Sequence, residues 1–476
     1  MSRARRKGGR DRSVSKQASF RRMKVCKFGG SSVASAEQIL KVLEIVRADP
    51  KRRVVVVSAP GKREKGDDKV TDLLIACAKE ALAGRDPSSA VERVAARYES
   101  IRADLDLPGS LVDALRAELA ARLAAPKDHP GAFEDAVKAL GEEFSARFCA
   151  AAFSARGVPA EYVDPKDAGM LLSEEFGAAQ LLPESYAALR AKLAPIPDVV
   201  VFPGFYGYTA SGRLATFSRG GSDITGAILA AALGADVYEN FTDVDAVYPV
   251  DPRLCPEAVG GEGIREMTFA EMRELSYAGF AVFHDEAVMP AIRAKIPINI
   301  RNTNHPDEPG TMVLPRRKSV PGRVNGIAAC PGFGALYVEK WLMNREVGFV
   351  AKLLAILAAE GVSIECMPAG VDSVTVVFKD EAFPEAVRGR VFARIEAELH
   401  PDHVSYSRGI AFLVAVGEGM RTTVGTCLHV VTALSRAGIN LQMINQGSSE
   451  LSIMFGIREV DLQPAVQALY REFFGA

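Results

Sequence analysis

The run of β-branched side chains at residues 53–57, which reads Arg-Val-Val-Val-Val, constrains the fold more than any other segment of the chain. A strand that is apolar on both faces is typical of the interior of a parallel sheet, because helices cover each face there. Other short apolar segments alternate with stretches whose apolar residues recur at helical spacing. This alternation predicts a layered α/β domain. Its further strands are expected at 23–28, 160–163, 199–202, 236–239 and 298–301.

A repeat follows the predicted α/β domain. From residue 335 the pattern predicts the order β-α-β-β-α-β, with the second strand at 362–367, and the same order restarts at residue 410 but ends with a helix. A spare strand at 324–330 can supply the strand that the second copy lacks, so the two copies are expected to fold as one piece. The predicted organisation is a disordered basic tail at 1–22, the α/β domain at 23–305, a linker at 306–323 and the paired region at 324–476, with 332–408 as first unit and 324–331 plus 409–476 as second unit.

Charge and cysteine content exclude several classes of protein. The net charge is -1, so no nucleic-acid or membrane partner is expected, although the tail at 1–22 could form a nucleic-acid arm. No apolar run reaches the length of a membrane span. The seven cysteines are scattered, which is typical of free thiols in a reducing compartment. We therefore expect a cytoplasmic protein.

A pair of glycines, Gly29 and Gly30, lies between the first predicted strand and a predicted helix. Backbone amides there can approach a phosphate group because no Cβ intervenes, and a helix N-terminus favours anions. The helix dipole contributes only about 0.3–1 kcal/mol at an exposed site. Holding a polyphosphate therefore needs a fixed cation as well, and Lys27 is adjacent. The alternative is a tight turn beside a solvated lysine.

A second pair, Gly220 and Gly221, again lies between a predicted strand and a predicted helix. Arg219 beside it can bind a carboxylate with two parallel hydrogen bonds, which a lysine cannot do. Asp223 either belongs to the site or only caps the helix. The acidic loop at 241–253 is either a third site segment or a solvated loop. Three such loops at the ends of separate strands together predict an anion-binding site.

The three loops, in this order and spacing, resemble the aspartate kinase family of the amino-acid kinase fold. The C-terminal repeat is similar to that family's paired ACT units, which are small ferredoxin-like modules that bind amino-acid effectors. The resemblance implies an α/β/α kinase domain followed by two nested ACT units. The implied reaction transfers the γ-phosphoryl group of ATP to the side-chain carboxylate of L-aspartate, giving 4-phospho-L-aspartate. The matching segments are 27–32, the region around Glu142, 217–223, 242–253, 275–279 and 341–349.

The resemblance also implies a role for each matching residue. Glu142 would hold the α-ammonium group of aspartate, with Glu143 beside it as the alternative, and Arg219 would bind a substrate carboxylate. The implied catalytic residues are Lys27, Asp223 and Arg219. The implied substrate contacts are Thr71, Glu142, Arg219 and Ser222, and the implied nucleotide contacts are Lys27, Gly29, Gly30, Ser31, Ser58, Gly220, Gly221, Thr242, Asp243, Tyr248 and Arg253.

The chemistry of the residues is compatible with this reaction. A carboxylate nucleophile is already ionised at pH 7, since its pKa is ordinarily about 3.9, so no catalytic base is needed. The difficulty is to bring an anion against a polyanionic phosphate, which demands positive charge and positioning. Mg²⁺ is expected to bind mainly through phosphate oxygens and water, so no protein ligand is predicted for it.

One position departs from the family pattern. Many aspartate kinases carry a lysine that contacts nucleotide phosphates after the helix at 269–278, and this chain has Ala281 there. Another cation would then have to compensate, or the nucleotide would bind differently. The segment at 280–285 resembles a divergent branch associated with ectoine synthesis, so the product would enter that pathway or another aspartate-derived one.

Regulation is the expected role of the C-terminal region. The resemblance implies that lysine or threonine binds there, and the region is expected to join two or more copies, most simply as a homodimer. The alternative is that the two units only dimerise the protein. The residues that match effector contacts are Met343, Gly348, Phe349, Val350, Ser363, Ile364, Glu365, Asn440 and Gln442.

Two rival functions remain at this point. One is a related kinase that acts on glutamate, acetylglutamate or a nucleoside monophosphate, against which the pair Glu142 and Arg219 argues. The other is a catalytically weak amino-acid sensor, which the alanine at position 281 suggests. Trapping an acyl phosphate with hydroxylamine would separate the kinase from the sensor.

Overall fold

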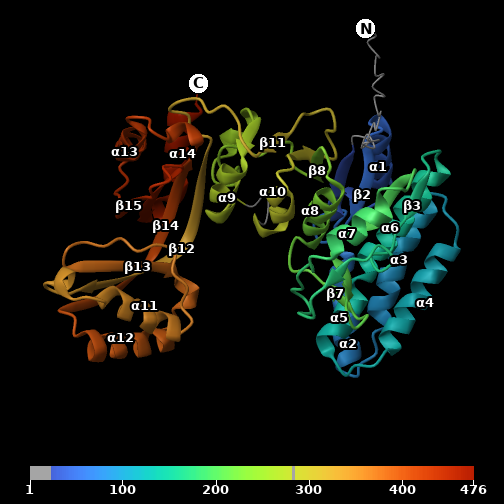
Figure 1. Cartoon of the computed structure of the whole chain (residues 1–476), viewed down its shortest axis with the longest axis horizontal. Helices are drawn as coiled ribbons and strands as arrows, with labels where there is room; N and C mark the ends of the chain where they lie inside the picture. Colours follow the sequence, from blue (N-terminus) through green and yellow to red (C-terminus); the bar gives the residue numbers. More distant parts are fainter. Residues whose placement is uncertain (1–22, 281–284, 476) are drawn as a thin grey trace, which may run out of the picture.

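The computed structural model describes residues 23–280 and 285–475. The N-terminal half is built on one eight-stranded sheet, shown in blue to yellow in Figure 1. All neighbouring strands in it are parallel except β10 and β11, which pair antiparallel. The layered α/β architecture predicted from the sequence is therefore confirmed. In spatial order the strands are β3 (Ala160–Tyr162), β5 (Val199–Pro203), β2 (Arg52–Val57), β1 (Lys24–Phe28), β8 (Val237–Thr242), β10 (Ile298–Asn302), β11 (Thr311–Leu314) and β9 (Glu266–Thr268).

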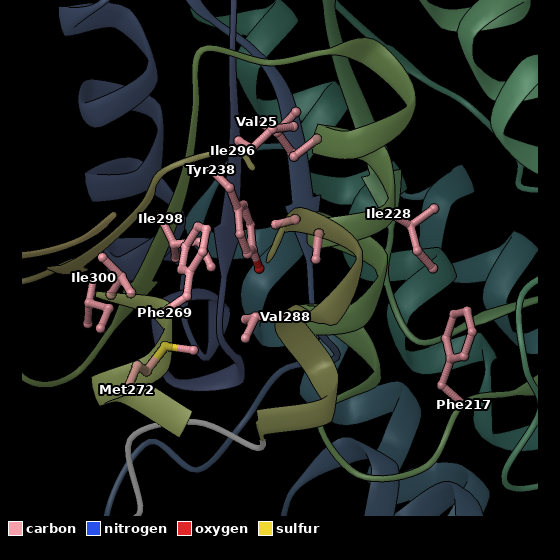
Figure 2. Packing of buried hydrophobic residues seen from close by; sticks show 14 of the residues in the cluster. Val25, Phe217, Ile228, Tyr238, Phe269, Met272, Val288, Ile296, Ile298 and Ile300 are labelled. Atoms are coloured by element: carbon pink, nitrogen blue, oxygen red, sulfur yellow. The ribbon is translucent and has the colours of Figure 1, made fainter. Parts of the chain in front are cut away.

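The valine run in β2 serves two cores. Val54 and Val56 pack into a cluster on one face of the sheet, whereas Val55 and Val57 pack into another cluster on the opposite face, because side chains alternate along a strand. Figure 2 shows the first cluster, with Tyr238 of β8 among its members. The face with Val55 and Val57 is covered by α1 (Ala36–Ala48), α2 (Val70–Leu82), α3 (Ser88–Asp104), α4 (Ser110–Ala124), α5 (Pro130–Lys138) and α6 (Leu140–Ala155). The face with Val54 and Val56 is covered by α7 (Ser185–Leu193), α8 (Gly221–Leu233), α9 (Phe269–Tyr277) and α10 (Met289–Arg293).

A small second sheet lies beside the main one. Its strands are β4 (Leu171–Leu172), β6 (Tyr206–Thr209) and β7 (Leu214–Thr216), and β6 and β7 form the hairpin that leads into α8.

The C-terminal region forms one five-stranded antiparallel sheet, on the left of Figure 1. Two long strands, β12 (Gly326–Glu339) and β14 (His403–Val416), pair along almost their whole length and belong to both repeats. The spare strand predicted at 324–330 is the first part of β12, so the two units are nested as expected. The other elements are α11 (Phe349–Ala359), β13 (Ser373–Lys379), α12 (Glu385–Leu399), α13 (Thr426–Arg436), β15 (Met443–Gln446), β16 (Ser452–Arg458) and α14 (Leu462–Phe473), and the strand order is β13-β12-β14-β16-β15.

Two local predictions differ from the structure. Part of the expected linker, Thr311–Leu314, is strand β11, whose alternating buried residues pair with β10 and β9. The strand expected at 362–367 is reduced to isolated bridges from Cys366 to Val377 and from Ala369 to Val374. Within the described ranges no helix is long and apolar enough to span a membrane, and the seven cysteines are free thiols, as predicted.

Candidate active site

Nine of the predicted site residues line one cavity of about 880 Å³ at the carboxyl ends of the parallel strands. Ligands of open α/β sheets bind at this edge, since the loops there leave a crevice. The residues come from the ends of β1 and β2, the first turns of α2 and α6, and the loop before α8. Of the residues predicted from the sequence, Lys27, Ser58, Thr71, Glu142, Arg219, Gly220, Gly221, Ser222 and Asp223 line it.

Lys27 and Asp223 form the centre of this cavity wall. The Lys27 Nζ lies 2.7 Å from Asp223 Oδ1, and the Asn240 side-chain amide donates to the same oxygen at 2.7 Å. No side-chain cap is formed at the start of α8, so Asp223 does not act as the helix cap. The lysine is 8% exposed, and the pair therefore holds its ammonium group at a fixed place.

The loop before α8 needs its glycines. Gly220 has φ 75°, a left-handed conformation that favours glycine. A Cβ on Gly221 would lie 2.5 Å from Cδ2 of Phe205. The start of α8, at Gly220, Gly221 and Ser222, lines the cavity, and the first amides of a helix have no partner within it, so this terminus can bind an anion.

The first glycine pair lies between β1 and α1, as the sequence predicts. The backbone makes one 3-10 turn at Gly30–Val33 before α1 begins at Ala36. Gly30 is required because a Cβ would lie 2.9 Å from the carbonyl oxygen of Ala59. A Cβ on Gly29 would lie 3.5 Å from Lys27 Nζ, so this loop and the loop before α8 meet at the same ammonium group. Ser31 is exposed and does not line the cavity.

The neighbouring glutamates Glu142 and Glu143 have different environments. Glu143 accepts hydrogen bonds from Arg122 at 2.5 Å and Arg147 at 2.6 Å, so its charge is already neutralised. Glu142 lines the cavity, is 5% exposed, and its Oε2 has no hydrogen-bond partner among residues 23–280 and 285–475. Burial raises the pKa of Glu142 to about 8, although hydrogen bonds from backbone amides and the charge of Lys138 oppose this rise. Of the two, Glu142 is the residue poised for a cationic ligand group.

Arg219 contributes an accessible positive charge to the cavity. Its side chain is exposed, and no ion pair or hydrogen bond ties it to another described residue. Ser222 is buried below it, whereas Ser58 and Thr71 are half-buried on other walls.

Four of the residues predicted to bind nucleotide lie around a second cavity of about 300 Å³, which follows β8. Because β8 pairs with β1, this cavity begins one strand away from Lys27. The hydroxyl of Thr242 donates to Asp243 Oδ1 at 3.2 Å. Arg253 is paired with Asp251 at 2.6 Å. Thr242, Asp243, Tyr248, Arg253 and Phe280 are among the residues that line the cavity.

The position of Ala281 lies outside the described residues, and so does most of the segment that resembles the ectoine-associated branch. No group of three acidic, histidine or cysteine side chains able to hold a metal ion occurs in the described part of the chain. Asp223 is the carboxylate beside Lys27, and a single carboxylate fits Mg²⁺, which is carried largely by phosphate oxygens and water.

The predicted effector residues lie on both C-terminal units. Gly348 has φ 87° and precedes α11, whose first residue, Phe349, is buried, and Met343 is buried in the 3-10 turn before it. Glu365 accepts a hydrogen bond from the hydroxyl of Tyr277. Ser363, Ile364, Asn440 and Gln442 are exposed, and Val350 is half-buried. Residues 363–365 lie beside β13 and Gln442 beside β15, which are opposite edges of the sheet, so the structure does not bring the two sets together within one chain.

Helix α9 joins the two halves of the chain. Glu271 accepts hydrogen bonds from Arg317 at 2.8 Å and from the backbone amide of Glu418 at 2.9 Å. One turn later Ser452 donates to Glu274 at 2.9 Å. Both C-terminal units therefore contact this helix, which ends just before Phe280 of the second cavity.

Comparison with known proteins gives one consistent result. Residues 22–302 match the model of the amino acid kinase family, and residues 413–473 match that of an ACT domain. Aspartokinase 3 of Bacillus subtilis is 50% identical over 452 residues, covering 95% of this chain and 99% of that protein. The aspartate kinase of Clostridium acetobutylicum is similar in structure, with TM-score 0.83, 34% identity, and coverage of 95% and 100% of the two chains. Aspartokinase III of Escherichia coli in complex with aspartate and ADP has TM-score 0.72 and 26% identity, with coverage of 94% and 99%, and its complex with lysine and aspartate has TM-score 0.71, with 26% identity and coverage of 95% and 99%.

Proposed function

Because this chain belongs to the aspartokinases of the amino acid kinase family, we propose that it transfers the γ-phosphoryl group of ATP to the side-chain carboxylate of L-aspartate. The observation that carries the proposal is the cavity in which Lys27, Glu142 and Arg219 converge. An amino acid with two carboxylates and one ammonium group is complementary to two cations and one buried carboxyl group.

Glu142 binds the α-ammonium group of aspartate in this proposal. Its carboxyl is buried, and its Oε2 lacks a partner among the described residues. An arriving ammonium group would therefore stabilise the ionised carboxylate, which burial alone disfavours. Arg219 holds a carboxylate with its planar guanidinium. Ser222 and Thr71 lie where their hydroxyls can donate to the same amino acid.

Lys27 offsets part of the negative charge through which the carboxylate nucleophile and the phosphate repel each other. Its ammonium group is fixed by Asp223 at 2.7 Å, and it stands between the amides of the loop before α8 and the loop at Gly29. Fixed donors of this kind stabilise the charge that develops during phosphoryl transfer, because they need no reorganisation. Ser58, Gly30, Gly220 and Gly221 complete the phosphate-binding surface, and Ser31, Thr242, Asp243, Tyr248 and Arg253 are assigned to the nucleotide on the strength of the family motif. Mg²⁺, when bound with the nucleotide, supplies further positive charge at the phosphates.

The C-terminal units regulate the enzyme in this proposal, with lysine as the effector. The complex of the Escherichia coli relative with lysine and aspartate supports that choice. Residues 363–365 and Gln442 lie at opposite edges of the sheet, so a second copy of the chain is needed to bring them to one site, which favours a homodimer. Helix α9 would transmit the binding, since both units and the second cavity meet it.

Trapping with hydroxylamine tests the reaction. The protein is incubated with ATP, Mg²⁺ and hydroxylamine, together with L-aspartate, L-glutamate or N-acetyl-L-glutamate. Aspartate is expected to give the hydroxamate, since only an acyl phosphate reacts in this way. Hydroxamate from glutamate or acetylglutamate alone would favour the related kinases, and none from any substrate would favour a non-catalytic sensor.

A further inference from the structure

One buried lysine in the cavity has no role in the family motif. Lys138 lines the cavity, is 9% exposed and ends α5. Only its neighbour Ala139 separates α5 from α6, and Ala139 has φ -64° and ψ -21°, which is helical. Lys138 and Glu142 are therefore spaced as i and i+4 along nearly continuous helical backbone, and side chains at this spacing share one face.

The ammonium group of Lys138 is held firmly but is not saturated. Its Nζ lies 2.7 Å from Asp135 Oδ1 and 5.7 Å from the centre of the Phe205 ring. An ammonium group has three donors, and across the ranges that the structure covers only the contact with Asp135 uses one of them. The remaining donors adjoin the cavity.

The carboxylate of Asp135 is saturated, in contrast. It is 1% exposed and its Oδ2 accepts from the amides of Gly177 at 2.8 Å and Thr216 at 2.7 Å. Asp135 thus anchors the lysine to the loop at Gly177 and to β7. These contacts fix the ammonium group of Lys138 in the wall of the cavity, and the contact with Asp135 uses one of its three donors. Lys138 can therefore act as a positioned donor to a ligand.

We propose that Lys138 binds the α-carboxylate of the amino-acid substrate and, with Glu142, forms a clamp for the zwitterionic end of an α-amino acid. The ammonium and carboxylate groups of an α-amino acid leave the same carbon, and side chains one helical turn apart can contact both. This inference rests on the proposed binding of aspartate in the cavity.

The test separates the charge of Lys138 from its structural contact with Asp135. Asp135→Asn keeps an oxygen that can accept from both backbone amides and keeps the lysine. The double variant Asp135→Asn/Lys138→Met removes the cation as well, but leaves no buried unpaired charge. Lys127→Met is the matched control, because Lys127 also lies over a phenyl ring, that of Phe133, yet is exposed and outside the cavity.

The dissociation constant of L-aspartate is measured by isothermal titration, and the KM values for aspartate and ATP by hydroxamate formation. We expect Lys127→Met to bind aspartate within about threefold of the unmodified protein. Asp135→Asn should bind it more weakly, because its lysine keeps its charge but loses its anchor, and the double variant should bind it most weakly, about 10–100-fold below the unmodified protein, with the KM for ATP unchanged. Equal dissociation constants for Asp135→Asn and the double variant, or an equal rise in the KM for ATP, would overturn the inference. Titration needs no turnover, so a protein that binds aspartate without forming hydroxamate would refute the kinase reaction and leave the inference to be judged on binding alone.

Discussion

Replacement of Glu142 by glutamine perturbs aspartate binding with almost no change of shape. The wild-type carboxyl is buried, and losing one member of a buried ion pair costs about 3–5 kcal/mol. Part of this cost is already present in the wild type. The Glu142 carboxyl has a pKa of about 8, so it must lose a proton before it can bind an ammonium group at pH 7, which costs about 1.4 kcal/mol per pKa unit. The net loss is about 1.6–3.6 kcal/mol, or roughly 15–400-fold in the KM for aspartate.

The assay is hydroxamate formation at pH 7 with aspartate and ATP varied in turn. The KM for ATP is expected to stay within about twofold, since Thr242, Asp243, Tyr248 and Arg253, which are assigned to the nucleotide, lie around the other cavity. A KM for aspartate that hardly changes in Glu142→Gln would refute the assignment of this residue to the ammonium group.

The pH dependence of the same variant provides a second readout. In the wild type the KM for aspartate should fall as the pH rises towards 8, because the carboxyl becomes ionised, and this fall should be absent in Glu142→Gln. The free energy of unfolding is expected to decrease over the same pH range. Because folding raises the pKa of Glu142, its contribution to stability is complete below about pH 4.5 and is lost as the pH rises through the folded value of about 8. The melting temperature of the variant should therefore decline less between pH 6 and pH 8 than that of the wild type. Parallel profiles would contradict the buried, unpaired state of Glu142.

Three further predictions concern charge and ligand binding. Lys27→Met should lower kcat about 10²–10³-fold, because it removes the ammonium group that Asp223 fixes at 2.7 Å, and a kcat within a few fold of the wild type would rule out its role in transfer. Glu239→Gln should lower the stability by about 3 kcal/mol, seen as a lower melting temperature, because Arg52 and its neighbouring cations lose a fully buried partner. Burial opposes ionisation of Glu239, but hydrogen bonds and the charge of Arg52 lower its pKa in the folded protein. This contribution to stability should therefore be present above about pH 4.5 and disappear as the pH falls through the folded value. An unchanged melting temperature of Glu239→Gln at pH 7 would contradict this prediction. L-lysine should raise the melting temperature and reduce hydroxamate formation, and an absence of both effects would favour C-terminal units that only dimerise the chain.

Much of the fold follows from patterns in the sequence. The valine run of β2 is buried on both faces as its composition predicts, and the nested repeats share β12 and β14 because the second copy visibly lacks a strand. Short elements were less predictable. Thr311–Leu314 stands in a proline-rich, charged stretch that resembles a linker, and only pairing with β10 and β9 makes it a strand.

The candidate site was predictable in its residues more than in its geometry. Gly29 and Gly30 lie between a strand and a helix as predicted, but contacts with Ala59 and Gly61, which are distant in sequence, place a 3-10 turn before α1 that the sequence pattern does not reveal. The choice between Glu142 and Glu143 depends on which side chain meets an arginine, and no pattern in a single sequence reveals that.

Lys138 was missed for a different reason. It does not belong to the motif at Glu142, and a lysine at the end of a helix is ordinarily solvated. A signal was available, since Lys138 precedes Glu142 by one helical turn. The burial that makes it notable arises from tertiary packing, through Asp135 and the loop at Gly177.

A crystal structure of the protein with L-aspartate and ADP would show directly where the amino acid binds. We expect it in the cavity between α6 and α8, with its ammonium group at Glu142 and its side-chain carboxylate facing Lys27. Aspartate bound outside that cavity, or bound within it with its ammonium group away from Glu142, would refute the assignment of this cavity to phosphoryl transfer.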